Sequence, residues 1–192
     1  GKKDDTAYFD VFFRTNPFKG GYTISNGLDN IIEYIKNFKF NDEDIEYLRK
    51  EGLNEEFLKY LKNLKFTGDI SAVLDGTPVF PNEPVITVKA PIIEAQIIET
   101  AILAHFNHAS LVTTAAKRIT NEAKGIPVME FGARRARGTS SANEASKYAY
   151  IGGCVGTSNV YAAKEYNIPA MGTMAHSMIE AFDTEYEAFM AY

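Results

Sequence analysis

The sequence predicts an α/β protein whose pattern changes near its middle. Residues 1–90 mix short strand-like and helix-like segments with turn residues, which indicates a small α+β domain. Residues 91–192 begin with a long helix and then alternate strand-like with helix-like segments, which indicates parallel βα units. The chain has 192 residues, of which 45% are hydrophobic, so it can bury a continuous core. Disorder is therefore excluded.

Three segments of the first part have the pattern of antiparallel strands. Over residues 8–14, Phe9 and Val11 alternate with more mixed positions, which predicts a strand with one apolar face. Residues 70–74 and 85–88 are short apolar runs bounded by turn residues, which predicts two further strands.

Helices are expected on both sides of residue 90. The apolar residues of 28–35 fall on one helical face, and Asn41 and Asn54 are positioned to cap two short packing helices. Residues 92–124 form a long helix-compatible run.

The remaining segments predict parallel βα units. Strands are expected over 128–132, 154–157 and 168–172, with helices over 141–150 and 160–166 between them. In such units the reactive groups lie at the carboxyl ends of the strands. A closed barrel needs about eight units, and only the first of these fit before residue 192.

Composition limits the classes of function. Lys and Arg total 20 and Asp and Glu total 25, for a formal net charge of -5. This balance excludes a general nucleic-acid binder, which must neutralise many phosphates. Cys154 is the only cysteine, which excludes an intramolecular disulfide and a cysteine zinc site and fits a reducing compartment. We expect Cys154 to be a buried packing residue and the protein to be cytoplasmic. No membrane segment is expected, because polar residues interrupt the longest apolar stretch, 90–106.

An arginine cluster follows the strand predicted at residues 128–132. Arg134 and Arg135 are adjacent there, and a guanidinium can donate two parallel hydrogen bonds to a carboxylate or a phosphate. The cluster therefore predicts an anion site. The alternative is a solvated basic loop with surface ion pairs, but a place at a strand end favours the anion site.

A glycine and hydroxyl loop follows the next predicted strand. It contains Gly156, Thr157, Ser158 and Asn159. Glycines let backbone N–H groups approach a ligand, and hydroxyls near a helix N-terminus favour phosphate. The same residues also fit an ordinary turn followed by a helix N-cap, and their spacing matches neither a Walker loop nor a dinucleotide fingerprint.

His176 follows the third predicted strand. An imidazole in this position can act as a base or as a nucleophile toward phosphorus. A lone histidine is more often structural, and His105 and His108, which lie on the long apolar helix, are interpreted as packing residues.

Several ordered blocks together resemble the nicotinate phosphoribosyltransferases, and the resemblance covers nearly the whole chain. The blocks are FFRTNPF at 12–18 with GGY at 20–22, FPNEP at 80–84, LVTTAA at 111–116, EFGARRA at 130–136, GTSN at 156–159 and GTMAHS at 172–177.

The resemblance implies a type II phosphoribosyltransferase, in which an α+β sandwich domain precedes an irregular α/β barrel. Such enzymes are usually homodimers whose active site is completed near the partner subunit. The implied reaction joins nicotinate to phosphoribosyl pyrophosphate, with ATP hydrolysis coupled to it and Mg²⁺ accompanying the pyrophosphate. The product, nicotinate mononucleotide, enters NAD salvage.

The resemblance also implies roles for residues in the matching blocks. His176 is the catalytic residue and becomes a phosphohistidine through ATP, and no residue is assigned as a metal ligand. The implied substrate-binding residues are Arg134, Arg135, Gly156, Thr157, Ser158, Asn159, Thr173 and Ser177. Family members also contain an earlier Thr-Asp-Tyr segment and later barrel strands, so we expect this chain to be an N- and C-terminally truncated piece.

Three other interpretations remain open. A nicotinamide phosphoribosyltransferase would use an acceptor for the amide where nicotinate calls for a second cation, which Arg135 can supply. A quinolinate phosphoribosyltransferase would need more cations and no phosphorylated histidine. A non-catalytic fragment would only bind a nucleotide or dimerise.

Overall fold

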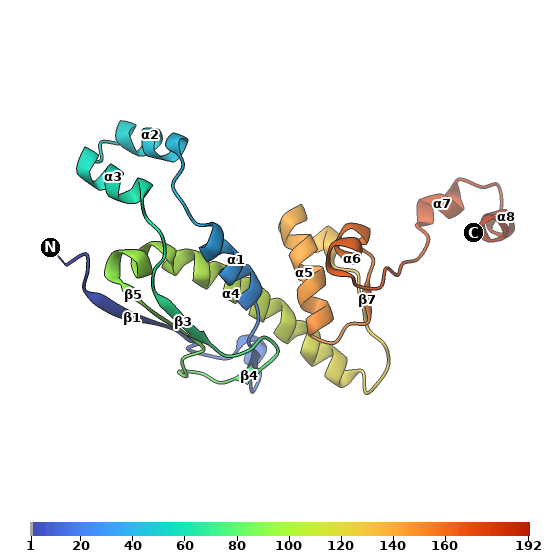
Figure 1. Ribbon diagram of the computed structural model, residues 1–192. Helices are drawn as coiled ribbons and strands as arrows, with labels where there is room; N and C mark the ends of the chain where they lie inside the picture. The colour runs from blue at the N-terminus through green and yellow to red at the C-terminus, as the bar shows by residue number, and fades with distance from the viewer. Residues whose placement is uncertain (1) are drawn as a thin grey trace. The chain divides into compact units, whose positions relative to one another are not determined.

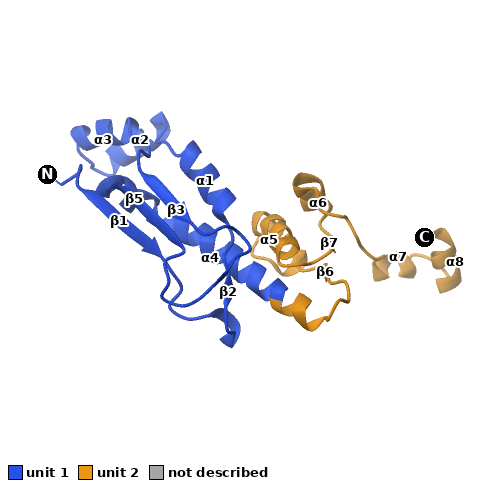
Figure 2. Ribbon diagram, turned by 60° about the horizontal axis from the view of Figure 1, so that its bottom comes forward, with its two compact units in different colours: residues 1–117 blue, residues 118–192 orange. Residues whose placement is uncertain are grey.

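The computed structural model describes residues 2–192, and its helices and short strands confirm the predicted α/β class (Figure 1). Contacts within the chain divide it into two compact units, residues 1–117 and 118–192 (Figure 2). The predicted long helix is present as α4 (Ile92–Glu122), and most of it belongs to the first unit. The domain boundary expected after residue 90 stays a prediction. In the described residues, no helix is long and apolar enough to cross a membrane.

A three-stranded antiparallel sheet forms the centre of the first unit. Its strands are β1 (Thr6–Val11), β5 (Ile86–Pro91) and β3 (Asp69–Ala72), with β5 in the middle. Phe9 of β1 lies opposite Val88 of β5, so apolar side chains from neighbouring strands share one face. The three strands predicted for this part of the chain are confirmed.

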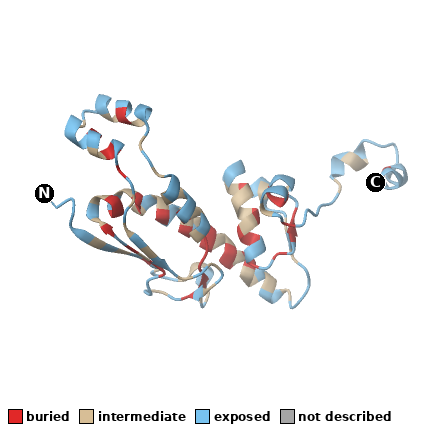
Figure 3. Ribbon diagram, in the orientation of Figure 1, coloured by how far each residue is buried: buried red, intermediate tan, exposed pale blue. Residues whose placement is uncertain are grey.

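Two helices pack their apolar faces against this sheet. They are α4 and α1 (Leu28–Asn37), and buried residues line α4 and the strands that it covers (Figure 3). The fully or nearly fully buried residues of this core are Val11, Ile31, Val79, Val85, Ile86, Val88, Ala90, Ala95, Ile98, Ile102 and Phe106. Their removal from water is the main force that holds the unit together.

Buried polar groups join the segment before α1 to the middle of α4. The Ile24 amide donates to Thr114 Oγ1 at 2.9 Å, and Asn26 Nδ2 donates to Thr113 Oγ1 at 2.6 Å. Ile24 belongs to β2 (Thr23–Ile24), which pairs with β4 (Pro78–Val79). Each buried donor finds an acceptor, so the polar atoms in this contact fix where the segment lies without an unpaired group.

The predicted helix caps are both present. The Asn41 side chain accepts from the Asp44 amide at the start of α2 (Asp42–Lys50), and the Asn54 side chain accepts from the Phe57 amide at the start of α3 (Glu55–Lys62). These bonds satisfy N–H groups that an α-helix leaves without an intrahelical partner.

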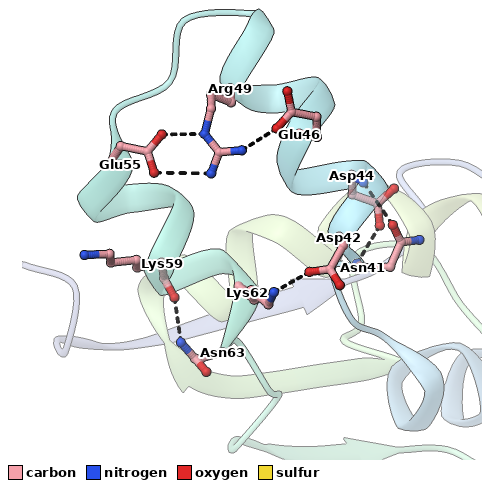
Figure 4. Close-up of polar contacts among 9 residues, drawn as sticks. All are labelled: Asn41, Asp42, Asp44, Glu46, Arg49, Glu55, Lys59, Lys62 and Asn63. Carbon is pink, nitrogen blue, oxygen red and sulfur yellow. Dashed lines mark hydrogen bonds and ion pairs between the residues drawn. The ribbon is translucent and has the colours of Figure 1, made fainter.

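Exposed ion pairs connect α2 with α3 (Figure 4). Arg49 Nη1 lies 2.5 Å from Glu46 Oε2, and Arg49 Nε lies 2.5 Å from Glu55 Oε1. The Lys62 ammonium pairs with the Asp42 carboxylate. Hydrogen bonds from these cations hold the pKa values of the Glu55 and Asp42 carboxyls below their usual range. Water screens these charged groups. We therefore attribute the stability of the α2–α3 helix pair to its buried leucines and isoleucine.

The second unit is built on a short parallel sheet. β6 (Met129–Glu130) pairs with β7 (Gly156–Thr157), and the connection between them contains α5 (Thr139–Ile151). After β7 come α6 (Val160–Tyr166), α7 (His176–Glu180) and α8 (Glu185–Ala191). The parallel pairing and the helices predicted between the strands are confirmed.

The strand predicted over 168–172 is shorter than expected. It makes one isolated parallel bridge, between Ala170 and Thr157. The Thr157 amide donates to the Pro169 carbonyl, and the Met171 amide donates to the Thr157 carbonyl, so pairing is limited to one position. β7 itself is only two residues long, which leaves no longer edge for this segment to follow.

Replacing Gly27 with Ala should destabilise the protein more than replacing Gly52 with Ala. Both glycines have positive φ values, +108° and +91°, where a side chain costs about 1–2 kcal/mol. A Cβ on Gly27 would also lie 2.9 Å from Ala109 Cβ and 3.2 Å from the His105 carbonyl oxygen, whereas one on Gly52 meets open space. Overpacking of that kind adds about 1–3 kcal/mol.

Equilibrium unfolding in urea gives the free energy of unfolding of both variants of the full-length protein. Equal losses in the free energy of unfolding would contradict the close approach of Gly27 to α4.

Candidate active site

The arginine cluster lies on a tight turn after β6. The turn contains the 3₁₀ helix η2 (Ala133–Arg135), and the Arg135 amide donates to the Gly132 carbonyl at 2.8 Å. Arg134 and Arg135 are exposed. Within residues 2–192 neither guanidinium has a hydrogen bond or ion pair, so in this part of an acidic chain both can bind an anion from solution.

The glycine and hydroxyl loop between β7 and α6 is bonded differently from the sequence expectation. The Thr157 amide donates to the Pro169 carbonyl, the Ser158 amide to the Glu130 carbonyl at 3.1 Å, and the Asn159 amide to Thr157 Oγ1 at 3.0 Å. These three N–H groups are therefore used within the protein, and the expected backbone cradle for phosphate is not formed by them. The exposed Ser158 hydroxyl is the group of this loop that remains open to a ligand.

Gly156 is required by packing in this structure. A Cβ there would lie 2.7 Å from the Pro169 carbonyl oxygen and 2.8 Å from the Met171 sulfur. Gly156 is buried, so it lets the next segment approach β7 and does not itself contact the solvent-filled space.

Glu130 belongs to the EFGARRA block at 130–136, but the sequence assigned it no role. One carboxylate oxygen, Oε2, accepts from Thr157 Oγ1 at 2.6 Å and from Ser146 Oγ at 2.9 Å, while Oε1 accepts from the Gly132 amide. The half-buried carboxylate thus contacts the arginine turn, α5 and β7. Its sequence signals are its place in that block and its acidic side chain inside a short apolar strand.

A pocket of about 710 Å³ lies between the arginine turn, the start of α5 and the start of α6. Pockets of about 300–1,000 Å³ are of the size that binds small molecules. Its lining residues are Ala133, Arg134, Ala136, Gly138, Thr139, Ala142, Asn143, Ser158, Asn159, Val160 and Tyr161. The structure therefore brings one predicted cation together with a hydroxyl and an amide from the next βα unit.

Asn159 both caps a helix and lines this pocket. Its side-chain oxygen accepts from the Ala162 amide at 3.2 Å, and its Nδ2 donates to Asn143 Oδ1 at 2.9 Å. The helix N-cap interpretation of the loop is confirmed, and it coexists with a place in the pocket wall.

The other predicted site residues do not line this pocket. Arg135 is exposed on the same turn as Arg134, whereas Gly156 and Thr157 are buried behind the wall. Thr157 is 0% exposed, but its hydroxyl joins a polar network and not an apolar core. Thr173 and Ser177 are exposed and lie outside the pocket lining. Their roles as substrate contacts stay predictions.

His176 is the first residue of α7, and its side chain is exposed. It follows the bridge at Ala170, as its expected position after a third strand requires. His105, by contrast, is half-buried on α4 with its ring 5.9 Å from that of Tyr34, which agrees with a packing role.

The described residues contain no cluster of the side chains that usually bind metal ions. Across residues 2–192, no group of three or more His, Cys, Asp or Glu side chains is placed to hold a metal ion.

Comparisons with known proteins agree with these motifs. The profile of the nicotinate phosphoribosyltransferase (NAPRTase) N-terminal domain matches residues 1–107, and that of the nicotinate phosphoribosyltransferase (NAPRTase) family matches residues 126–190. The chain is 45% identical over 188 residues to a nicotinate phosphoribosyltransferase of Mycobacterium tuberculosis (strain ATCC 25618 / H37Rv), covering 97% of this chain and 41% of that protein. It is 45% identical over 193 residues to the nicotinate phosphoribosyltransferase of Bacillus subtilis (strain 168), covering 100% of this chain and 39% of that protein.

Solved structures are similar as well. The crystal structure of human nicotinic acid phosphoribosyltransferase superposes with a TM-score of 0.87 and 32% identity, over 94% of this chain and 37% of that one. The nicotinate-nucleotide pyrophosphorylase of Pyrococcus furiosus superposes with a TM-score of 0.77 and 26% identity, over 96% of this chain and 40% of that one. The chain thus spans about two fifths of the length of these relatives.

Cys154 should react slowly with iodoacetamide in the native protein. Its side chain is 7% exposed, and burial raises the pKa of its thiol, with the nearby charge of Glu130 as a smaller cause. Less thiolate is therefore present at neutral pH, and the reagent has poor access to it. Mass spectrometry of the peptide that contains Cys154 gives the rate, with urea-unfolded protein as the control. Equal rates in the two states would contradict the buried position.

Proposed function

The chain belongs to the nicotinate phosphoribosyltransferase family, and from this membership we propose that the protein of which it forms a part transfers a phosphoribosyl group to nicotinate. The donor is phosphoribosyl pyrophosphate, and the products are nicotinate mononucleotide and pyrophosphate. The reaction supplies a nucleotide for NAD salvage.

The observation that carries the proposal is the pocket in which unpaired Arg134 lies with Ser158 and Asn159. Both substrates are anions, one through a carboxylate and the other through phosphates. A guanidinium with no protein partner binds either group well, because it is always charged and can donate two parallel hydrogen bonds. Arg135, next to it on the turn, supplies a second cation.

The charge changes of the reaction fit these residues. As pyrophosphate leaves C1 of the ribose, negative charge grows on the leaving group, and fixed cations and hydrogen-bond donors lower the energy of that state. The pyridine nitrogen of nicotinate attacks with its lone pair and has no proton to lose. The transfer therefore needs no general base, and the described pocket lining contains no carboxylate.

We further propose that ATP hydrolysis is coupled to the transfer through His176. Imidazole accepts a phosphoryl group more readily than a serine hydroxyl without an adjacent base. His176 is exposed and therefore accessible to a nucleotide. Mg²⁺ would enter with phosphoribosyl pyrophosphate as its counterion. We also propose a cytoplasmic homodimer.

The deciding experiment is an assay of the full-length protein with labelled phosphoribosyl pyrophosphate. Nicotinate, nicotinamide and quinolinate are compared as acceptors, each with and without ATP. We expect nicotinate to be the preferred acceptor and ATP to stimulate its use. Preference for nicotinamide or quinolinate, or no transfer to any acceptor, would reject the proposal.

Arg134→Ala should lower kcat/KM for nicotinate by the equivalent of about 1.5–3 kcal/mol, the range for a hydrogen bond to a charged group. Arg134→Lys should recover only part of the loss, since an ammonium lacks the planar fork. Arg135→Ala is expected to have an effect of the same kind. The matched control is Arg137→Ala, which removes an exposed arginine that lies after the η2 turn and does not line the pocket. If Arg134→Ala and Arg137→Ala behave alike in steady-state kinetics, Arg134 is not part of the anion site.

His176→Asn should abolish ATP hydrolysis and the acid-labile phosphoenzyme but leave a slow transfer that does not depend on ATP. The pocket remains intact in this variant, because His176 does not line it. Labelling with γ-³²P-ATP followed by acid treatment measures the phosphoenzyme. Persistence of the acid-labile label in His176→Asn would assign the phosphoryl group to another residue. Thermal unfolding of the variant shows whether it is folded.

A further inference from the structure

We propose that Glu130 is a positioning residue, whose carboxylate holds the arginine turn and the Ser158 loop in one arrangement at the pocket. Glu130 does not line the pocket itself. Glu130 acts through the groups that it holds on two sides of the pocket. The kinetic consequence rests on the function proposed above, whereas the structural consequence can be measured without any substrate.

The Glu130 carboxylate is hydrogen-bonded to the arginine turn. Glu130 Oε1 accepts from the amide of Gly132, and the Gly132 carbonyl in turn accepts from the Arg135 amide at 2.8 Å. These two bonds form the base of the turn that carries Arg134. Because Arg134 has no side-chain partner among the described residues, the turn is held through its backbone.

Glu130 is also hydrogen-bonded to the Ser158 loop, through its carboxylate and through its backbone carbonyl. Glu130 Oε2 accepts from Thr157 Oγ1 at 2.6 Å, and Thr157 Oγ1 accepts from the Asn159 amide at 3.0 Å. The Ser158 amide donates to the backbone carbonyl of Glu130 at 3.1 Å. Both loop residues that line the pocket are therefore bonded to Glu130 directly or through Thr157.

A carboxylate at the centre of this network fixes which groups donate hydrogen bonds and which accept them. An ionised carboxylate only accepts hydrogen bonds, so the single proton of Thr157 is directed at Glu130. The lone pairs of the Thr157 oxygen then face the Asn159 N–H. A glutamine at this position would have an NH₂ at one end, so it would meet either the Gly132 N–H or the two hydroxyls with a donor.

Water has little access to the hydroxyl end of this network. Thr157 is 0% exposed and Ser146, which also donates to Glu130, is 1% exposed. Removing the Thr157 hydroxyl takes a donor from Glu130 Oε2 and an acceptor from the Asn159 amide, and loss of such bonds is costly where water has little access. Breaking the network should therefore loosen both loops together.

The test uses four variants of the full-length protein. Thr157→Val removes the hydroxyl at nearly constant shape, Thr157→Ser keeps it, and Glu130→Gln changes the acceptor. The matched control is Thr113→Val, which removes another fully buried hydroxyl, bonded to Asn26 in the first unit. All four are checked by thermal unfolding, so that a general loss of stability can be separated from a local effect.

The substrate-free measurement is amide hydrogen exchange by mass spectrometry. Thr157→Val and Glu130→Gln should speed exchange in the peptides that cover residues 131–138 and 156–162. Thr157→Ser and Thr113→Val should leave both peptides close to wild type. Unchanged exchange over residues 131–138 in Thr157→Val would overturn the proposal, because the two loops would then be independent. If Thr157→Val does not fold, Glu130→Gln decides by the same criterion.

The kinetic measurement separates positioning from direct contact. Misplaced loops should raise KM for nicotinate and for phosphoribosyl pyrophosphate by about 10- to 100-fold, the effect of losing one hydrogen bond to a charged group. kcat should fall less, and Thr157→Ser should restore KM. Wild-type KM values for both substrates in Thr157→Val would overturn the proposal. A wild-type protein with no transfer activity rejects the proposed function instead, and hydrogen exchange still decides whether Glu130 positions the loops.

Discussion

One carboxylate connects the elements that form the pocket of the second unit. Glu130 accepts hydrogen bonds from the arginine turn, from α5 and from β7, so three segments distant in sequence share a single acceptor group. The parallel sheet here is only two residues long in each strand, and its ladder alone gives few bonds. The side-chain network supplies the connections that a longer sheet would make through its backbone.

The first unit depends on a different feature, a helix whose buried face is mainly apolar over its first half and carries small polar groups farther along. α4 contributes Ala95, Ile98, Ile102 and Phe106 to the core against the sheet. Farther along the same helix, buried hydroxyls form hydrogen bonds with the segment from Ile24 to Asn26. Short side chains let the backbone of that segment approach the helix closely.

Local chemistry explains why the helices and caps could be predicted. Asn41 and Asn54 cap their helices through their own side chains, and Val160 to Tyr166 form a helix as the pattern indicates. Strand lengths were less predictable, because a strand extends only as far as its neighbour allows. The run 168–172 makes a single bridge, since β7 offers no further partner.

The sequence by itself determined the fold class, the family and the βα loops on which the predicted site residues lie, because these follow from periodicity, turn residues and motifs. Tertiary structure decided which of those residues meet. Arg134, Ser158 and Asn159 share one pocket, while Thr157 turns inward to Glu130 and the amides of residues 157–159 bond within the protein. A motif names the groups that can bind an anion, but whether each donor is still free depends on acceptors that distant segments bring to it.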